Sequence, residues 1–236
     1  GIPTIQVKDL TIQRRDDDLV VATFGRGFYV LDDYSPLREL SESLEEKEAH
    51  VFEIEDAYMY NTSRNLSYQG EVYFRAENPK PEAVFRYYIK EGFESLKQKR
   101  VKAQKKALEE GTEYPYPTEE ELLEEKQESK PQLVFTIYDD EGQIMRKMIQ
   151  SLGKGYKSVS WDLSYLKKYG PMVPPGDYSL SIDKVHDSEV TRLIDKKDFK
   201  VFTLPNALGS PDYGDKFTFM KDVVDLNAEV TAARRK

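Results

Sequence analysis

The stretch QLVFTIYDDEGQIMRKMIQ, residues 132–150, decides the fold class of this chain. Its two halves, Gln132–Tyr138 and Ile144–Gln150, are rich in β-branched and long apolar side chains, which favour strands. Residues 139–142 between them are acidic and end in glycine, as is typical of a tight turn, because glycine reaches positive φ at little cost. The stretch therefore predicts an antiparallel hairpin.

Further strand signals lie on both sides of this hairpin and are separated by turn residues. They cover residues 51–54, 71–75, 84–90, 158–162, 177–183, 190–194 and 198–202. Pro174-Pro175-Gly176 predicts a second turn, which leads into one of these strands. The alternation of strands and helices that marks a parallel sheet is absent. Short strands of this kind predict a mainly β chain, folded as an antiparallel immunoglobulin-like β-sandwich.

One segment, residues 91–130, interrupts the strands and predicts an inserted helical arm. It is rich in Glu, Lys, Gln and Ala and carries apolar residues at helical spacing. Gly111 is expected to end a first helix, and Thr118 with Glu121 forms a capping box that begins a second. The arm is either a solvated helical hairpin across one edge of the sandwich or a docking element for a partner.

Both ends of the chain differ from this middle part. Residues 5–12, 19–24 and 28–31 are strand candidates, and Gly25-Arg26-Gly27 predicts a tight turn between the last two. Three strands are marginal alone, so we expect them to belong to a larger sheet assembly and the chain to be a fragment.

Near the other end, a linker leads into a helix over Phe217–Val230. The residues expected on its apolar face are Phe219 or Met220, Val223 or Val224, Leu226 or Asn227, and Val230. This helix either packs back on the sandwich or opens a longer helical region.

Composition excludes several classes of function. The 236 residues include 35 Lys and Arg and 43 Asp and Glu, which gives a net charge of −8. This charge argues against non-specific electrostatic binding of nucleic acid. With no Cys and only two His, far apart at His50 and His186, thiolate chemistry and a Cys-ligated zinc are excluded, and we expect no metal and no cofactor. No window approaches the roughly 20 apolar residues of a membrane span.

Two ordered groups of residues resemble a known family. The first consists of DLTI at 9–12, DLVVAT at 18–23, GRGFYVLDD at 25–33 and Pro36-Leu37. The second consists of Asn78-Pro79, Tyr87-Tyr88, Asp140-Glu141-Gly142, Arg146, Gly155, Trp161-Asp162-Leu163 and Pro175-Gly176-Asp177-Tyr178. Together they resemble the C-terminal region of secreted bacterial proteins of the BNR-repeat, sortilin-like glycosyl hydrolase family.

The resemblance implies three parts: the terminal strands of a β-propeller blade at 1–40, an immunoglobulin-like sandwich at 41–204 with its helical insertion at 91–130, and a linker with the start of a helical region at 205–236. It also implies an extracellular or periplasmic location and an upstream propeller of the same polypeptide as partner. Polysaccharide or another protein is a further candidate partner.

The resemblance has limits. Phe24 stands where the family often has a His, and the Ser-x-Asp-x-Gly-x-Thr-Trp turn of the propeller does not occur in the chain. The family's hydrolase activity is attributed to the propeller, so the resemblance does not carry it over to these residues.

Asp32 and Asp33 are the first candidates for catalysis, because glycoside hydrolysis needs two carboxyl groups across a sugar site. Other acidic clusters, at 16–18 and 139–140, lie at expected turns, where Asp satisfies backbone donors. Residues 16–18 or residues 139–141 could hold a weakly bound calcium ion, although the spacing of a dedicated calcium loop is missing.

Tyr114 and Tyr116 are the candidates for carbohydrate binding, because neighbouring prolines favour an extended segment that exposes their rings. Trp161 alternates with Val159 and Leu163 and is expected in the core. The interpretation that covers most of these observations is a non-catalytic accessory module. The alternatives are a contribution of acidic residues to a hydrolase site completed by the propeller, and a carbohydrate-binding sandwich.

Overall fold

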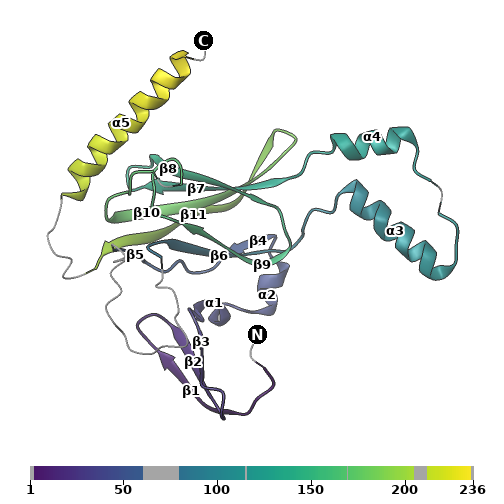
Figure 1. Ribbon diagram of the computed structural model, residues 1–236, viewed down its shortest axis with the longest axis horizontal. Helices are drawn as coiled ribbons and strands as arrows, with labels where there is room; N and C mark the ends of the chain where they lie inside the picture. Colours follow the sequence, from purple (N-terminus) through teal and green to yellow (C-terminus); the bar gives the residue numbers. More distant parts are fainter. Residues whose placement is uncertain (1–2, 61–79, 115, 169, 205–211, 235–236) are drawn as a thin grey trace, which may run out of the picture.

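The computed structural model describes residues 3–60, 80–114, 116–168, 170–204 and 212–234. The chain is mainly β, with three sheets, two short helices near the N-terminus, a pair of helices on one side and a C-terminal helix (Figure 1). The predicted strand at 71–75 and the landmark Asn78-Pro79 lie outside the described residues, as does the linker at 205–211.

The first sheet is antiparallel and confirms the three N-terminal strands. Its strands are β1 (Val7–Gln13), β2 (Asp18–Thr23) and β3 (Phe28–Leu31), in that spatial order. Gly25 and Gly27 have φ of 77° and 75°, so the predicted turn does use the conformation that glycine allows. The short helices α1 (Ser35–Arg38) and α2 (Glu42–Glu46), which were not predicted, lead from this sheet to the rest of the chain.

The second sheet has five strands, and the hairpin of residues 132–150 is confirmed at one edge of it. In spatial order the strands are β5 (Ala57–Met59), β11 (Glu189–Thr203), β10 (Gly176–His186), β7 (Gln132–Asp139) and β8 (Ile144–Ser151). Asp139 Oδ1 accepts a hydrogen bond from Gln143 N at 2.7 Å, as expected of a turn Asp. β5 was not predicted, and it pairs parallel with β11, unlike the other strand pairs of this sheet.

The prediction of two strands at 190–194 and 198–202 is wrong, because one strand, β11, covers both. The pairing with β10 shifts register between Leu180↔Lys197 and Ile182↔Ile194. The charged residues around Lys196 lie at this irregularity, which, like a β-bulge, shifts the pairing without ending the strand. His186, expected in a turn, is the last residue of β10.

The third sheet is antiparallel and packs with the second over one hydrophobic core. Its strands are β4 (Ala49–Val51), β6 (Ala83–Ile89) and β9 (Gly155–Trp161), with β6 in the centre. Phe85 of β6 meets Phe199 of β11 with ring centroids 5.3 Å apart, and Tyr87 meets Phe135 of β7 at 5.0 Å. These edge-on contacts join the two sheets.

Trp161 is fully buried in this core, as predicted. Its indole Nε1 donates to the carbonyl oxygen of Ser164 at 2.9 Å, so the polar atom of the ring is satisfied. The ring also meets that of Tyr178 with centroids 5.6 Å apart. A role for Trp161 as an exposed sugar platform is therefore excluded.

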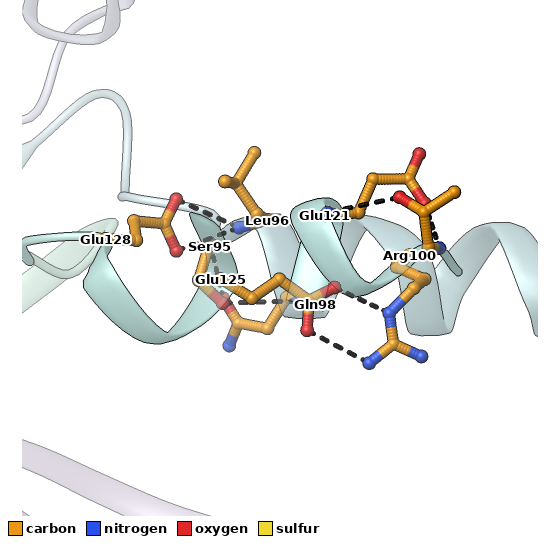
Figure 2. A network of polar contacts seen from close by, with 8 residues as sticks. Ser95, Leu96, Gln98, Arg100, Glu121, Glu125 and Glu128 are labelled. Carbon is orange, nitrogen blue, oxygen red and sulfur yellow. Dashed lines mark hydrogen bonds and ion pairs between the residues drawn. The ribbon is translucent and has the colours of Figure 1, made fainter. Parts of the chain in front are cut away.

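Two helices, α3 (Leu96–Glu110) and α4 (Glu119–Gln127), lie between β6 and β7 in the sequence and project from one end of the sheets (Figure 1). The predicted signals at their ends are confirmed: Gly111 has φ of 69° after α3, and Thr118 forms a capping box with Glu121. Arg100 binds the Glu125 carboxylate across the pair, with Nε 2.5 Å from Oε1 (Figure 2). Both oxygens of Glu128 accept from Leu96 N at 3.0 Å.

The C-terminal helix α5 (Tyr213–Arg234) contacts the core at its first turns, which is the first of the two predicted alternatives. Phe217 meets Tyr165 edge-on with centroids 5.6 Å apart. The predicted apolar face is only partly right, since Val224 packs on the core whereas Phe219 and Leu226 are exposed. Within the described residues, no helix is both long enough and apolar enough to cross a membrane.

Candidate functional site

A cluster of charged side chains connects the N-terminal sheet to the core. Asp33 lies between β3 and α1 with φ of 48°, a conformation that Asp tolerates better than most residues. Its buried carboxylate forms an ion pair with Arg86 of β6 and accepts from Ser35 N at 2.9 Å. Asp33 N donates to Asp18 Oδ1 at 3.1 Å, so a single residue ties β2, α1 and β6 together.

Glu55, between β4 and β5, completes this cluster, because its carboxyl interacts electrostatically with Asp33 and Arg86. We call Asp33, Glu55 and Arg86 the polar joint. Glu55 is exposed as a residue. Desolvation of its carboxyl and the negative charge of Asp33 nevertheless raise its pKa to about 7, although the charge of Arg86 acts in the opposite direction. Near neutral pH the Glu55 carboxyl is therefore partly protonated beside the Arg86 guanidinium.

The polar joint has the geometry of a structural link. The Glu55 carboxyl interacts directly with Asp33 and Arg86, whereas the two carboxyl groups of a glycosidase are about 5 to 10 Å apart with the sugar between them. Asp32 and Asp33 are in different environments, since Asp32 is exposed and Asp33 is buried. A catalytic role of Asp32 or Asp33 stays a prediction that this arrangement does not support.

The other acidic clusters serve local structure. Asp16 binds Gln13 Nε2 at 2.8 Å and forms an ion pair with Arg15, while Asp17 forms one with Arg38. Among the residues that the structure describes, no group of three or more His, Asp or Glu side chains is placed to hold a metal ion. Asp16 thus has its partners within its own turn, and Asp17 has its partner on α1.

Tyr114 and Tyr116, the candidates for carbohydrate binding, lie in the connection between α3 and α4. Tyr116 keeps 88% of its surface exposed and Tyr114 keeps 39%. Tyr116 therefore presents a ring to solvent, as a sugar platform requires.

A contact cluster that the sequence did not predict surrounds the turn between β10 and β11. The ring of His186 lies 5.8 Å from that of Phe93, just before α3, and its Nε2 lies 3.3 Å from the carbonyl oxygen of Ser129, just after α4. Ser129 Oγ also donates to Asp187. Both ends of the α3–α4 segment are thus held by one turn.

Sequence reasoning missed two of the three members of the polar joint. Asp33 was singled out because it belongs to an acidic pair, but Glu55 and Arg86 are isolated charged residues. Arg86 alternates with the buried Phe85 and Tyr87 in β6, and an arginine on a strand is usually a solvated residue. The one available signal was its position in a strand that is otherwise apolar.

Comparisons with known proteins leave the chain without an assigned family. No model of a protein family matches it, and no curated protein matches it. Among solved structures it is similar to dimeric latent PorU from Porphyromonas gingivalis, at 14% sequence identity and a TM-score of 0.33. The similarity covers 79% of this chain and 12% of the PorU chain, and at this level it carries no inference about fold or function.

Proposed function

We propose that this chain is a non-catalytic module from the C-terminal region of a secreted bacterial BNR-repeat, sortilin-like β-propeller protein. In this proposal residues 1–40 end the propeller, residues 41–204 form an immunoglobulin-like sandwich with α3 and α4 as an inserted helical arm, and residues 205–236 begin a helical region. The sandwich braces the propeller and presents an interaction surface. The location is extracellular or periplasmic.

The observation that carries the proposal is the apolar character of both faces of the β1–β3 sheet. On one face Ile12, Leu19 and Leu31 form a row across the strands, and on the other Val30 and Phe28 stand beside Val20 and Ala22. Phe28 is 76% exposed and Leu10 is 58% exposed. Exposed apolar surface on both faces is typical of a sheet that is covered on both sides in a larger assembly, such as a propeller.

Two further observations support the proposal. The second and third sheets share one core, as the two sheets of a sandwich do, and the parallel pairing of β5 with β11 is a departure from a purely antiparallel fold. The polar joint fixes the start of the module to β6, as a bracing role requires.

The sequence of the complete coding region tests the proposal directly. We expect blades with Ser-x-Asp-x-Gly-x-Thr-Trp turns upstream of the β1–β3 sheet, and their absence would overturn the proposal.

Assays of the full-length protein on polysaccharides test the non-catalytic role. We expect any turnover to be unchanged by Asp32→Asn, which alters an exposed carboxylate. Loss of turnover in that variant, with an unchanged melting temperature, would instead assign Asp32 to a hydrolase site.

Carbohydrate binding is the second candidate function, and the exposure of Tyr116 favours it. It predicts heat changes on titration of the chain with oligosaccharides. Tyr116→Ala should reduce them and Tyr58→Ala should not, since Tyr58 is an exposed tyrosine of β5 and not of the connection between α3 and α4. Flat titrations of the unaltered chain would remove this candidate.

A further inference from the structure

A cavity of about 500 Å³ lies where α3 leaves the sheets. It is open to solvent and is bordered by the connection between β6 and α3, the first turns of α3, and the turn between β8 and β9. The residues that matter for its chemistry are Phe93, Glu94, Lys97, Val101, Lys102 and Lys154. Its volume lies within the range of sites that hold small organic molecules.

The charge of this cavity is positive although the chain as a whole is acidic. Lys102 forms an ion pair with Glu94, with Nζ 2.5 Å from Oε1. Lys97 and Lys154 form no ion pair within the described part of the chain. The lining thus has two ammonium groups that form no ion pair among the described residues, although Lys97 also acts at longer range on Glu125, which is bound to Arg100. Such groups attract an anion.

The wall of the cavity is mainly apolar. Phe93 and Val101 are half-buried, and the aliphatic stems of the lysines add apolar surface below their charged ends. His186 packs against Phe93 and limits the positions of its ring. An aromatic body can therefore lie against Phe93 while an attached acidic group reaches the ammonium groups.

Gly92 brings the two sides of the cavity together. A Cβ atom at this position would lie 2.9 Å from Lys154 N, closer than side-chain carbons approach such atoms. Glycine thus lets the connection before α3 lie directly against the turn that carries Lys154. The close approach sets Lys154 at the same cavity as the lysines of α3.

We propose that this cavity binds a small aromatic anion, in which an aryl group carries a phosphate, sulfate or carboxylate. The aryl group lies against Phe93 and Val101, and the acidic group lies between Lys97 and Lys154. The site is independent of the proposed bracing role.

Titration calorimetry at low ionic strength tests the proposal with 2-naphthyl phosphate, 2-naphthyl sulfate and 2-naphthoate as probes. We expect saturable binding of at least one probe, and about tenfold weaker binding of neutral 2-naphthol and of inorganic phosphate, which each lack half of the interaction. Comparison of the three probes shows which acidic group fits best.

The double variant Lys97→Gln/Lys154→Gln provides the decisive comparison. We expect it to weaken the best probe about tenfold, because it removes both unpaired charges. The matched control is Lys99→Gln/Lys105→Gln, which removes the same charge from exposed positions of α3 outside the cavity and should change the affinity less than about twofold.

Three results would overturn the proposal: no saturable binding of any probe, an equal loss in the two double variants, or equal binding of 2-naphthol. The last would mean that the probes adsorb to apolar surface only. Because exposed lysines are replaced by glutamine, both variants should fold, and their melting curves check this.

Discussion

Asp33 is the residue on which the connection between the first sheet and the core depends. Its side chain is 3% exposed, and its partner Arg86 is 27% exposed. Removing Asp33 leaves the partly buried charge of Arg86 without its closest carboxylate, with Glu55 still beside it.

We therefore expect Asp33→Asn to lower the free energy of unfolding by about 2 kcal/mol, less than for a fully buried pair because Arg86 keeps some solvent. Asn tolerates the φ of Asp33, so the variant removes the charge without adding backbone strain. Denaturant unfolding measures the change. Asp32→Asn is the matched control and should change stability by less than about 0.5 kcal/mol. Equal effects of the two would show that the ion pair contributes nothing.

Glu55 gives the polar joint a dependence on pH. Its pKa is raised from 4.5 to about 7 by partial burial and by Asp33, against the opposing charge of Arg86 and with a smaller effect of Asp17. A raised pKa means that folding favours the protonated carboxyl. The stabilisation is thus complete below about pH 4.5 and is lost as the pH rises through about 7.

Unfolding of the unaltered chain and of Glu55→Gln between pH 4 and 8 measures this effect, because glutamine stays neutral throughout. The stability of the unaltered chain should fall relative to that of Glu55→Gln as the pH rises across this range. Parallel curves for the two proteins would contradict the shift.

At the scale of elements, the end of α3 depends on a left-handed residue, Gly111, whose amide bonds to carbonyl oxygens of the last turn. Gly111 has φ of 69°, and a Cβ atom there would meet nothing within 4 Å. Gly111→Ala should therefore destabilise the end of α3 by about 1 kcal/mol through backbone strain. Faster hydrogen exchange of the last α3 amides, by roughly fivefold, would report this loss.

Gly111→Asn is the control for that change, because Asn occupies the left-handed region more readily than Ala. It should lie between the unaltered chain and Gly111→Ala. Identical exchange in all three would mean that the left-handed residue does not limit α3.

The elements that the sequence predicts are those with local causes. The hairpin at 132–150, the turn at Gly25–Gly27 and the cap at Thr118 each depend on residues a few positions apart. β5 escaped prediction because it is three residues long and pairs with β11, which lies more than a hundred residues later. β11 was divided in two because its charged bulge resembles a turn in the sequence.

The polar joint could be predicted only in part for the same reason. Asp33 and Arg86 are 53 positions apart, and the sequence contains nothing that pairs them. The cavity near α3 likewise combines Phe93 with Lys154, which belong to segments separated by two helices and two strands. Residues of such a group can be recognised only once the fold shows that they lie together.

At the scale of the whole molecule, the exposed apolar side chains of the β1–β3 sheet should contribute little to the stability of the isolated chain. Phe28→Ser/Val30→Thr changes two exposed side chains on one face. We expect the melting temperature to shift by less than about 2 °C, while binding of the neutral dye Nile red decreases because apolar surface is lost.

The control is Leu108→Ser, which changes one side chain that is 82% exposed on α3 and should reduce dye binding less. A large fall in melting temperature for Phe28→Ser/Val30→Thr would mean that this face is already packed within the chain, and would remove the main support for a covering partner.

The turn between β10 and β11 contacts Phe93 at one end of the helical arm and Ser129 at the other. Since entry and exit lie beside the same histidine, a short flexible linker can join them without pulling the sheets apart. The segment from α3 to α4 can thus be exchanged as a unit. A protein engineer can therefore graft another helical hairpin at the same place without altering the core that carries it.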